Sequence, residues 1–183
     1  MPPWLARGRA LVKESVVVEL APMLQEEFAQ FRDQVVSSHA REKVRAGLWH
    51  PCEAVYLAVQ SFRDLLPMGL DTPNHHLLSV LDEITGSRIG GIWFESQEMK
   101  PTPEARLHYL LIYEPYRRQS YATHALQAFE ARAHELGLDR VAFHVSGYNR
   151  AALALYAKLG YATLEVSMAK DLMPIPADVP AAR

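Results

Sequence analysis

The sequence contains a single cysteine, Cys52, so one chain cannot form a disulfide within itself. This scarcity is typical of proteins from a reducing compartment. The sequence also lacks an excess of charge of either sign. Its net charge of −2 gives no general attraction to nucleic acid or to an anionic membrane. Any function that depends on positive charge must therefore come from a local group of basic residues.

Long apolar runs are missing as well. No stretch approaches the roughly 20 residues that a membrane helix needs, and residues 1–15 lack the continuous apolar segment of a signal peptide. We therefore expect a cytoplasmic protein. The 183 residues, of which 49% are hydrophobic, suffice for one well-packed domain. We expect that domain over residues 14–172, with loose termini at 1–13 and 173–183.

The first half of the chain predicts one strand, two helices and a hairpin. A β-branched run predicts a strand at 15–20. Apolar residues at helical spacing from Met23 to Val35 predict one helix, and a second is expected over residues 53–65. The segments on either side of the turn sequence ITGS predict a β-hairpin across 75–97.

The second half alternates strands and helices. It predicts a buried strand at 106–113, a helix at 121–137, a strand at 140–146, a helix at 149–160 and a closing strand at 161–172. The resulting order is β-α-α-β-β-β-α-β-α-β. This order predicts an α/β (α+β) fold with a mixed central sheet and helices on both faces.

Two arginines directly precede the helix that begins within YRRQSYATHAL, residues 116–126. A helix amino end carries about half a positive charge and favours acidic neighbours, so Arg117 and Arg118 lie at the electrostatically unfavourable end. A bound anion such as pyrophosphate would resolve this, since free N–H groups and guanidinium groups would both contact it. The alternative is a solvated surface turn. A Walker loop is excluded, because the sequence has no GxxxxGK[ST] motif.

The segment LLIYEPYRRQSYATHAL resembles motif A of the GNAT-type (GCN5-related) N-acetyltransferases, Q/R-x-x-G-x-G/A, with Arg117 in the first position and Ala122 in the last. Downstream, HVSGYNRAALALYAKLGY resembles motif B of the same family, with Asn149 followed seven residues later by Tyr156. The two motifs and the order of elements around them cover residues 75–170.

Ser120 departs from the motif, because the family has glycine at this position. Serine keeps the main-chain N–H and adds a hydroxyl group, but its Cβ disfavours a positive φ angle. If the loop requires a left-handed residue here, we expect affinity for the coenzyme to suffer.

The resemblance implies the GNAT acyl-CoA N-acyltransferase fold and direct transfer of an acetyl group from acetyl-CoA, a co-substrate, to a primary amine without a metal. Tyr156 would be the general acid that protonates the departing thiolate. The general base is not identified by the motifs. The candidates are Glu114 at the end of the 106–113 strand, Glu95 at the end of the preceding strand, and His108; of these we name Glu114 and His108. The residues expected to contact the coenzyme are Ile112, Tyr113, Arg117, Arg118, Gln119, Ser120, Tyr121, Ala122, Thr123 and Asn149.

Several alternatives remain open at this point. His75 and His76 are adjacent strand residues that point to opposite faces, so no metal site is expected. The acceptor is either a small-molecule amine or a protein amine, with no nucleic acid or membrane partner and with a homodimer among the open oligomeric states. A competing hypothesis is a non-catalytic, acyl-CoA-binding or sensory GNAT-like domain. A third is a module that binds an acidic partner through exposed arginines.

Overall fold

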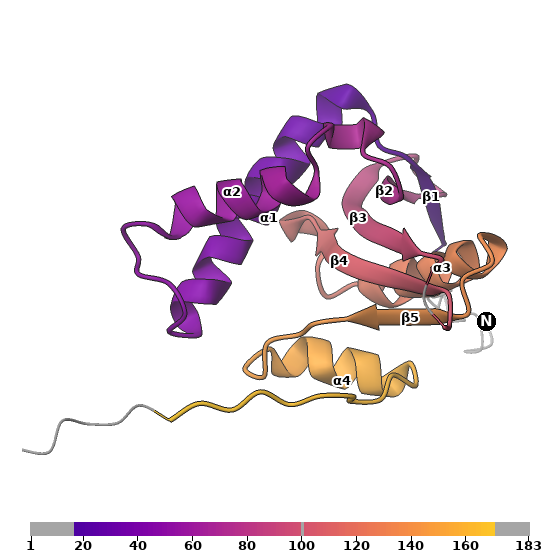
Figure 1. Cartoon of the computed structure of the whole chain (residues 1–183). Coiled ribbons are helices and arrows are strands. Elements are labelled where there is room, and N and C mark those ends of the chain that lie inside the picture. The colour runs from indigo at the N-terminus through magenta and orange to yellow at the C-terminus, as the bar shows by residue number, and fades with distance from the viewer. Residues whose placement is uncertain (1–16, 100, 171–183) are drawn as a thin grey trace, which may run out of the picture.

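A five-stranded mixed sheet organises the protein, for which a computed structural model describes residues 17–99 and 101–170. The strands follow one another across the sheet (Figure 1) in the order β1 (Val18–Pro22), β2 (His75–Asp82), β3 (Arg88–Gln97), β4 (Glu104–Ile112) and β5 (Arg140–Phe143). The first four strands pair antiparallel, and β4 pairs with β5 in parallel. Pro22 is tolerated because β1 is an edge strand.

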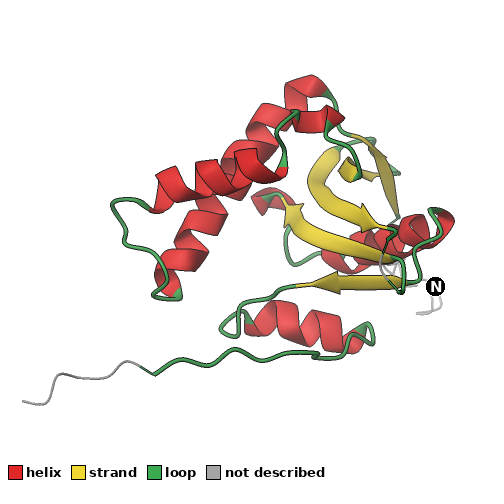
Figure 2. Ribbon diagram, in the orientation of Figure 1, coloured by secondary structure: helices red, strands yellow, loops and turns green. Residues whose placement is uncertain are grey.

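Helices cover both faces of this sheet (Figure 2). They are α1 (Gln25–Arg45), α2 (Ala54–Leu65), α3 (Tyr121–Glu135) and α4 (Arg150–Lys158), with single 3₁₀ turns η1 (Gly69–Asp71) and η2 (Glu114–Tyr116). None of the helices within the described ranges is long and apolar enough to cross a membrane.

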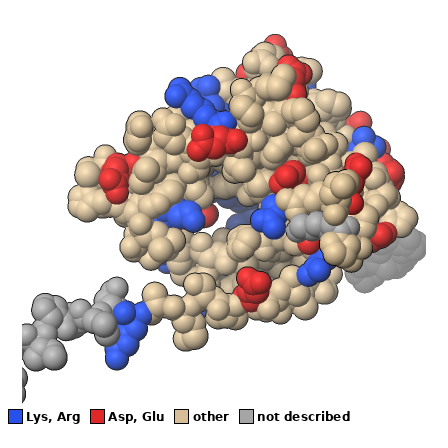
Figure 3. Space-filling model, viewed as in Figure 1, with Lys and Arg blue, Asp and Glu red and all other residues tan. Residues whose placement is uncertain are grey.

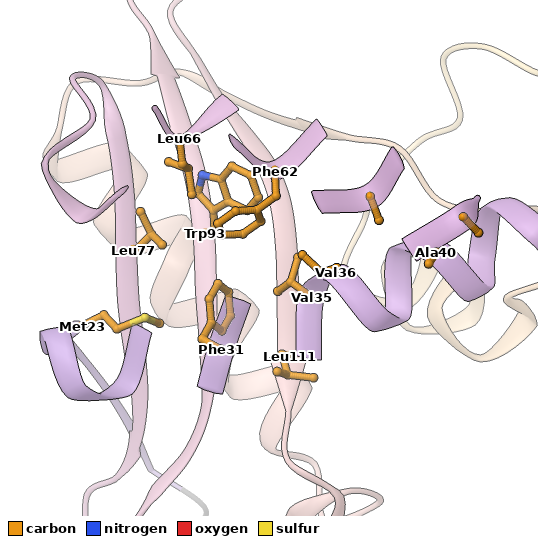
Figure 4. Close-up of a cluster of buried hydrophobic side chains, with 12 residues drawn as sticks. Met23, Phe31, Val35, Val36, Ala40, Phe62, Leu66, Leu77, Trp93 and Leu111 are labelled. Atoms are coloured by element: carbon orange, nitrogen blue, oxygen red, sulfur yellow. The ribbon is translucent and has the colours of Figure 1, made fainter. Parts of the chain in front are cut away.

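One hydrophobic core lies between the sheet and the α1–α2 pair (Figure 4). Phe31 of α1 is fully buried there, beside Trp93 of β3 and Phe62 of α2. Two adjacent glycines of β3 permit this close packing. A Cβ on Gly91 would lie 2.8 Å from the Phe31 ring, and a Cβ on Gly90 would lie 2.1 Å from the carbonyl oxygen of Leu111. Any side chain at these positions would push α1 or β4 away.

The second core lies on the opposite face, under α3. Its helix contributes Ala125, Leu126, Phe129 and Ala133, which are all buried at the spacing of three and four residues that forms one helical stripe. Phe129 packs on Phe94 of β3 with ring centroids 4.9 Å apart. Leu155, Tyr156 and Leu159 of α4 and its end pack at the margin of this core.

The predicted fold class and the order of elements from β1 to α4 are confirmed. The predicted closing strand is wrong over residues 161–170, which contain no strand; residues 171 and 172 lie outside the described ranges. The apolar–polar alternation there is real, but Leu164, Val166 and Met168 are 67%, 75% and 91% exposed. Alternation forms a strand only where a neighbouring strand supplies hydrogen bonds.

Two other predicted strands were misjudged in length. The strand predicted at 140–146 ends at Phe143, because the chain leaves β4 there and enters a turn closed by the Asn149 N–H donating to the carbonyl of Ser146 at 2.8 Å. The strand predicted at 15–20 runs from Val18 to Pro22, and residues 15 and 16 lie outside the described ranges. The expected loose termini, 1–13 and 173–183, lie outside the described ranges as well.

Candidate active site

The strands β4 and β5 part midway along β4. Their pairing extends only from Glu104 opposite Arg140 to Leu107 opposite Phe143, whereas β4 continues to Ile112. A β-bulge lies at the same point, because Leu107 pairs with Phe94 and Tyr109 with Trp93. His108 is therefore the extra residue of the bulge. In the space-filling view a deep hollow opens in the middle of this face, with Lys or Arg side chains on two sides of it (Figure 3).

Beyond the bulge, alternate main-chain groups of β4 point away from β3. The Tyr113 N–H donates to the carbonyl of Ile89 at 2.8 Å, and the Tyr113 carbonyl accepts from the Tyr116 N–H at 2.9 Å. Both main-chain groups of Tyr113 are thus used within the protein. Because strand groups alternate sides, those of Ile112 face the opened edge, where the Ile112 carbonyl accepts from Arg117 Nε at 2.9 Å.

The turn between β4 and α3 has the conformation of an anion-binding loop. Arg118 and Ser120 have positive φ angles of 64° and 67° and are separated by one residue without this conformation. Such alternation forms concave arrays of N–H groups known as nests. Ser120 is the N-cap of α3 but makes no side-chain capping bond, and the first turn of α3 contains no acidic residue. The partial positive charge at the start of α3 is therefore not balanced by an acidic side chain from the first turn of the helix.

Local contacts hold this loop in place. The Tyr121 hydroxyl donates a hydrogen bond to the Asp82 carboxylate at the end of β2, and the N–H groups of Ile84 and Thr85 donate to the other oxygen at 3.0 and 2.9 Å. The tyrosine bond is the largest cause of a lowered Asp82 pKa, so the carboxylate is charged at neutral pH. On the other side of the loop, Gln119 Nε2 donates to the carbonyl of Pro115 at 2.9 Å.

The remaining predicted loop residues follow the same turn. Ala122 and Thr123 belong to the first turn of α3, where the Thr123 N–H donates to the carbonyl of Ser120 at 3.0 Å. Arg117 lines a cavity of about 520 Å³ together with Leu111 and the facing side of α1. The structure therefore places Arg117, the first residue of the predicted 117–123 turn, beside the open edge of β4.

Asn149 and Tyr156 occupy the two ends of α4. Asn149 caps the helix by accepting from the Ala152 N–H at 3.2 Å. Tyr156 packs on Phe143 with ring centroids 4.3 Å apart, so it lies beside the last residue of β5. Burial raises the Tyr156 pKa, and the carboxylate of Glu42 raises it further. Tyr156 therefore holds its proton at neutral pH.

An aromatic and polar cluster surrounds the bulge on the α1–α2 face. His108 stacks on Trp93 with ring centroids 4.6 Å apart, and its Nε2 lies 3.4 Å from the carboxylate of Glu95. Trp93 Nε1 donates to His75 Nδ1 at 3.0 Å. Burial is the main cause of a lowered His108 pKa, which the Glu95 contact partly opposes. At neutral pH the imidazole is neutral and can accept a proton.

The structure does not bring Glu114 together with His108. Glu114 is exposed and begins η2, after the end of β4. The strand residues from His108 to Ile112 alone span about 13 Å at the rise of a β-strand. Of the two candidate bases, only His108 lies where β4 and β5 part.

Sequence reasoning missed a polar site between α1 and the β5–α4 connection. Arg41, Glu42 and Arg45 of α1 line a cavity of about 580 Å³ with Tyr148 and Asn149, whereas Tyr156 does not line it. Polar residues at this spacing are typical of a solvated helix face. No signal in the sequence distinguishes a solvated helix face from a cavity wall here, because the β5–α4 connection that covers α1 lies more than 100 residues away in the chain.

Within residues 17–99 and 101–170, no three or more His, Cys, Asp or Glu side chains gather in an arrangement that could hold a metal ion. His75 and His76 do point to opposite faces: His75 contacts Trp93, while His76 stacks on Phe94 with ring centroids 4.5 Å apart.

Comparisons with known proteins agree with this geometry. Residues 39–161 match the model of the Acetyltransferase (GNAT) family. The uncharacterized N-acetyltransferase YycN of Bacillus subtilis is 38% identical over 158 residues, which cover 86% of this chain and 100% of the relative. The uncharacterized N-acetyltransferase YdgE of the same organism is 35% identical over 153 residues, which cover 84% and 97%.

Solved structures agree as well. A crystal structure of B. subtilis YycN superimposes with a TM-score of 0.83 at 37% identity, covering 86% of this chain and 100% of that one. A Pyrococcus furiosus structure with 16% identity and a TM-score of 0.61 covers 85% and 99% and shares the fold. On the family match and the identity to these relatives, the chain belongs to the GNAT family of acetyltransferases.

Proposed function

We propose that this acetyltransferase takes the acetyl group from acetyl-CoA and transfers it directly to a primary amine. The observation that carries the proposal is the parting of β4 and β5 next to an α3 start that is flanked by two arginines. When bound, acetyl-CoA supplies an activated thioester whose carbonyl carbon an amine can attack. The residues of this chain then have to bind the coenzyme, remove a proton from the amine and return one to the sulfur.

The turn of residues 117–123 fits the pyrophosphate of the coenzyme. Its left-handed residues at 118 and 120 turn N–H groups toward an anion, and the first turn of α3 adds the helix dipole without an acidic competitor. Arg117 and Arg118 contribute charge-assisted hydrogen bonds. The Ile112 carbonyl holds Arg117 Nε, which positions one guanidinium group at the end of β4.

Tyr156 is the proposed general acid. It lies beside Phe143, where β5 ends and the opening begins. Because burial raises its pKa, its hydroxyl is protonated at neutral pH and can donate to a thiolate, whose conjugate acid has a pKa of about 8.5. Asn149 at the other end of the same helix is the proposed contact for the coenzyme arm.

His108 is the proposed general base, positioned by Glu95. A neutral imidazole that donates through Nε2 to a carboxylate has Nδ1 as its acceptor. The contact between His108 Nε2 and Glu95 at 3.4 Å favours that tautomer. The bulge brings this ring to the point where the strands part, within reach of an amine that enters from the α1–α2 face.

Two measurements test the proposal on the full chain. The first is the melting temperature with acetyl-CoA. At 100 times the dissociation constant, binding stabilises a fold by about 2.7 kcal/mol, which for a domain of this size is a rise of about 5–11 °C. Dephosphorylated pantetheine should give little shift. Arg117→Gln should weaken the effect, while Arg132→Gln, on the exposed side of α3, should not.

The second measurement is release of free thiol from acetyl-CoA across a panel of amines. Turnover that depends on the amine supports the transferase. No thermal shift at millimolar acetyl-CoA would overturn the coenzyme site. A clear shift without turnover on any amine would favour the non-catalytic acyl-CoA-binding alternative.

A further inference from the structure

The polar face of α1 is covered by the connection between β5 and α4. Ser38, Arg41, Glu42 and Arg45 follow one another at the three- and four-residue spacing of one helical face. The Tyr148 hydroxyl donates to the main-chain carbonyl of Glu42 at 3.2 Å, and the Arg45 guanidinium lies 4.1 Å from the centre of the Tyr148 ring. These contacts close one side of the 580 Å³ cavity, which lies within the usual size range for small-molecule sites.

Glu42 is the acidic residue that lines this cavity. Its carboxylate forms no ion pair with any residue in the ranges 17–99 and 101–170. Burial raises the Glu42 pKa, and the nearby charges of Lys43 and Arg41 only partly oppose this. A half-buried carboxylate without a paired cation is less favourable than one in open water, and a cationic ligand would relieve this.

Three arginines line the same cavity: Arg41, Arg45 and Arg150. None of them pairs with a carboxylate in the described part of the chain. Arg45 is stacked on Tyr148, and Arg41 Nη1 donates to Ser37 Oγ at 2.7 Å. The cavity is therefore positively charged overall, so a ligand with ammonium groups alone would meet more repulsion than attraction.

The cavity adjoins the proposed reaction centre. The charge of Glu42 is near enough to raise the pKa of Tyr156 on α4 and that of Tyr109, which follows the bulge. Asn149 lines the cavity directly. The neighbouring cavity shares Ser38 and Arg41 with it and leads to Arg117. The phosphate end of the coenzyme and this cavity thus lie at two ends of one groove along α1.

We propose that this cavity binds the acceptor and that the acceptor is a small zwitterion, an amine that also carries a carboxylate. Glu42 contacts an ammonium group, and Arg41 and Arg150 contact the carboxylate through charge-assisted hydrogen bonds. Arg45 holds Tyr148 as the wall between them. The inference rests on the proposed acetyl transfer and narrows the acceptor to amino-acid-like compounds.

Matched pairs of acceptors test it, because each amino acid can be compared with the amine that remains after removal of its carboxylate. Suitable pairs are ornithine with putrescine, lysine with cadaverine, and phenylalanine with phenethylamine. Thiol release should give a kcat/KM for at least one amino acid about tenfold or more above that of its partner amine, the usual effect of a charged hydrogen bond.

Three variants locate the effect. Arg150→Gln should weaken the preference for the carboxylate, because only Arg41 then remains to contact it. Glu42→Gln should raise the KM for the acceptor about tenfold or more. Glu42→Asp keeps the negative charge, so its KM for the acceptor should lie between those of wild type and Glu42→Gln. In each case the KM for acetyl-CoA should stay within about twofold of wild type, as expected when only acceptor binding is lost. Melting temperatures and acetyl-CoA binding report whether each variant is folded.

The outcomes separate this inference from the transferase itself. Equal or faster acetylation of the decarboxylated amines overturns the zwitterion proposal and leaves acetyl transfer standing. An undiminished preference for amino acids in folded Arg150→Gln, together with an unchanged KM for the acceptor in folded Glu42→Gln, overturns the assignment of this cavity. Coenzyme binding without turnover on any acceptor overturns both proposals together.

Discussion

Replacement of Ser120 by glycine should make the protein more stable and bind acetyl-CoA at least as tightly. Ser120 has a φ angle of 67°, and the left-handed conformation costs a residue with a Cβ about 1–2 kcal/mol. Its hydroxyl makes no capping bond whose loss would offset the gain. Glycine also increases the conformational entropy of the unfolded chain, which lowers the free energy of unfolding by about 0.4–1 kcal/mol and offsets part of the gain. The expected net gain is about 0.5–1 kcal/mol, or about 1–4 °C in melting temperature.

The assay is thermal unfolding with and without acetyl-CoA, together with a titration of the coenzyme. Ser87→Gly is the matched control, because Ser87 lies in a turn without a positive φ and glycine there should lower stability by about 0.4–1 kcal/mol. Ser120→Val should bind acetyl-CoA about tenfold more weakly or worse, since a β-branched residue is a steric outlier in this conformation. If Ser120→Gly lowers stability as much as the control does, the strain argument is refuted. Wild-type affinity in Ser120→Val would mean that the coenzyme does not contact this loop.

Three further predictions concern chemistry, packing and pH. Tyr156→Phe keeps the ring and should lower kcat toward the lower end of the ~10²–10⁴-fold range of general acid catalysis with little change in the KM for acetyl-CoA; undiminished turnover where chemistry is rate-limiting would return Tyr156 to a packing role. Gly90→Ala places a Cβ 2.1 Å from the Leu111 carbonyl and should lower the free energy of unfolding by about 1–3 kcal/mol or more in urea, whereas Gly147→Ala, with nothing within 4 Å, should not. Burial is the main cause of lowered pKa values for His39, His75, His76 and His108 relative to 6.5. Between those lowered pKa values and 6.5 the unfolded chain binds more protons than the folded chain does. Acid therefore favours unfolding, and the urea midpoint should fall as pH is lowered from about 7.5 to about 5.5. A constant or rising midpoint would contradict this.

Much of the architecture was readable from the sequence because it depends on local spacing. The helical repeats of α1 and α3 and the hairpin of β2 and β3 involve residues a few positions apart, so periodicity and turn residues reveal them. The same holds for the 117–123 turn, where two arginines precede a helix without acids in its first turn. The resemblance to the GNAT motifs then predicted the family that the comparisons confirm.

Tertiary structure alone decided which distant groups meet. The bulge that brings His108 to the parted strands depends on the register between β3 and β4, and a register is not visible in either strand alone. Glu42 and Tyr148 are 106 positions apart, and their contact turns an ordinary polar helix face into a cavity wall. The failed strand at 161–170 has the same cause in reverse: its alternation is a local property, whereas a strand requires a partner that only the folded chain can supply.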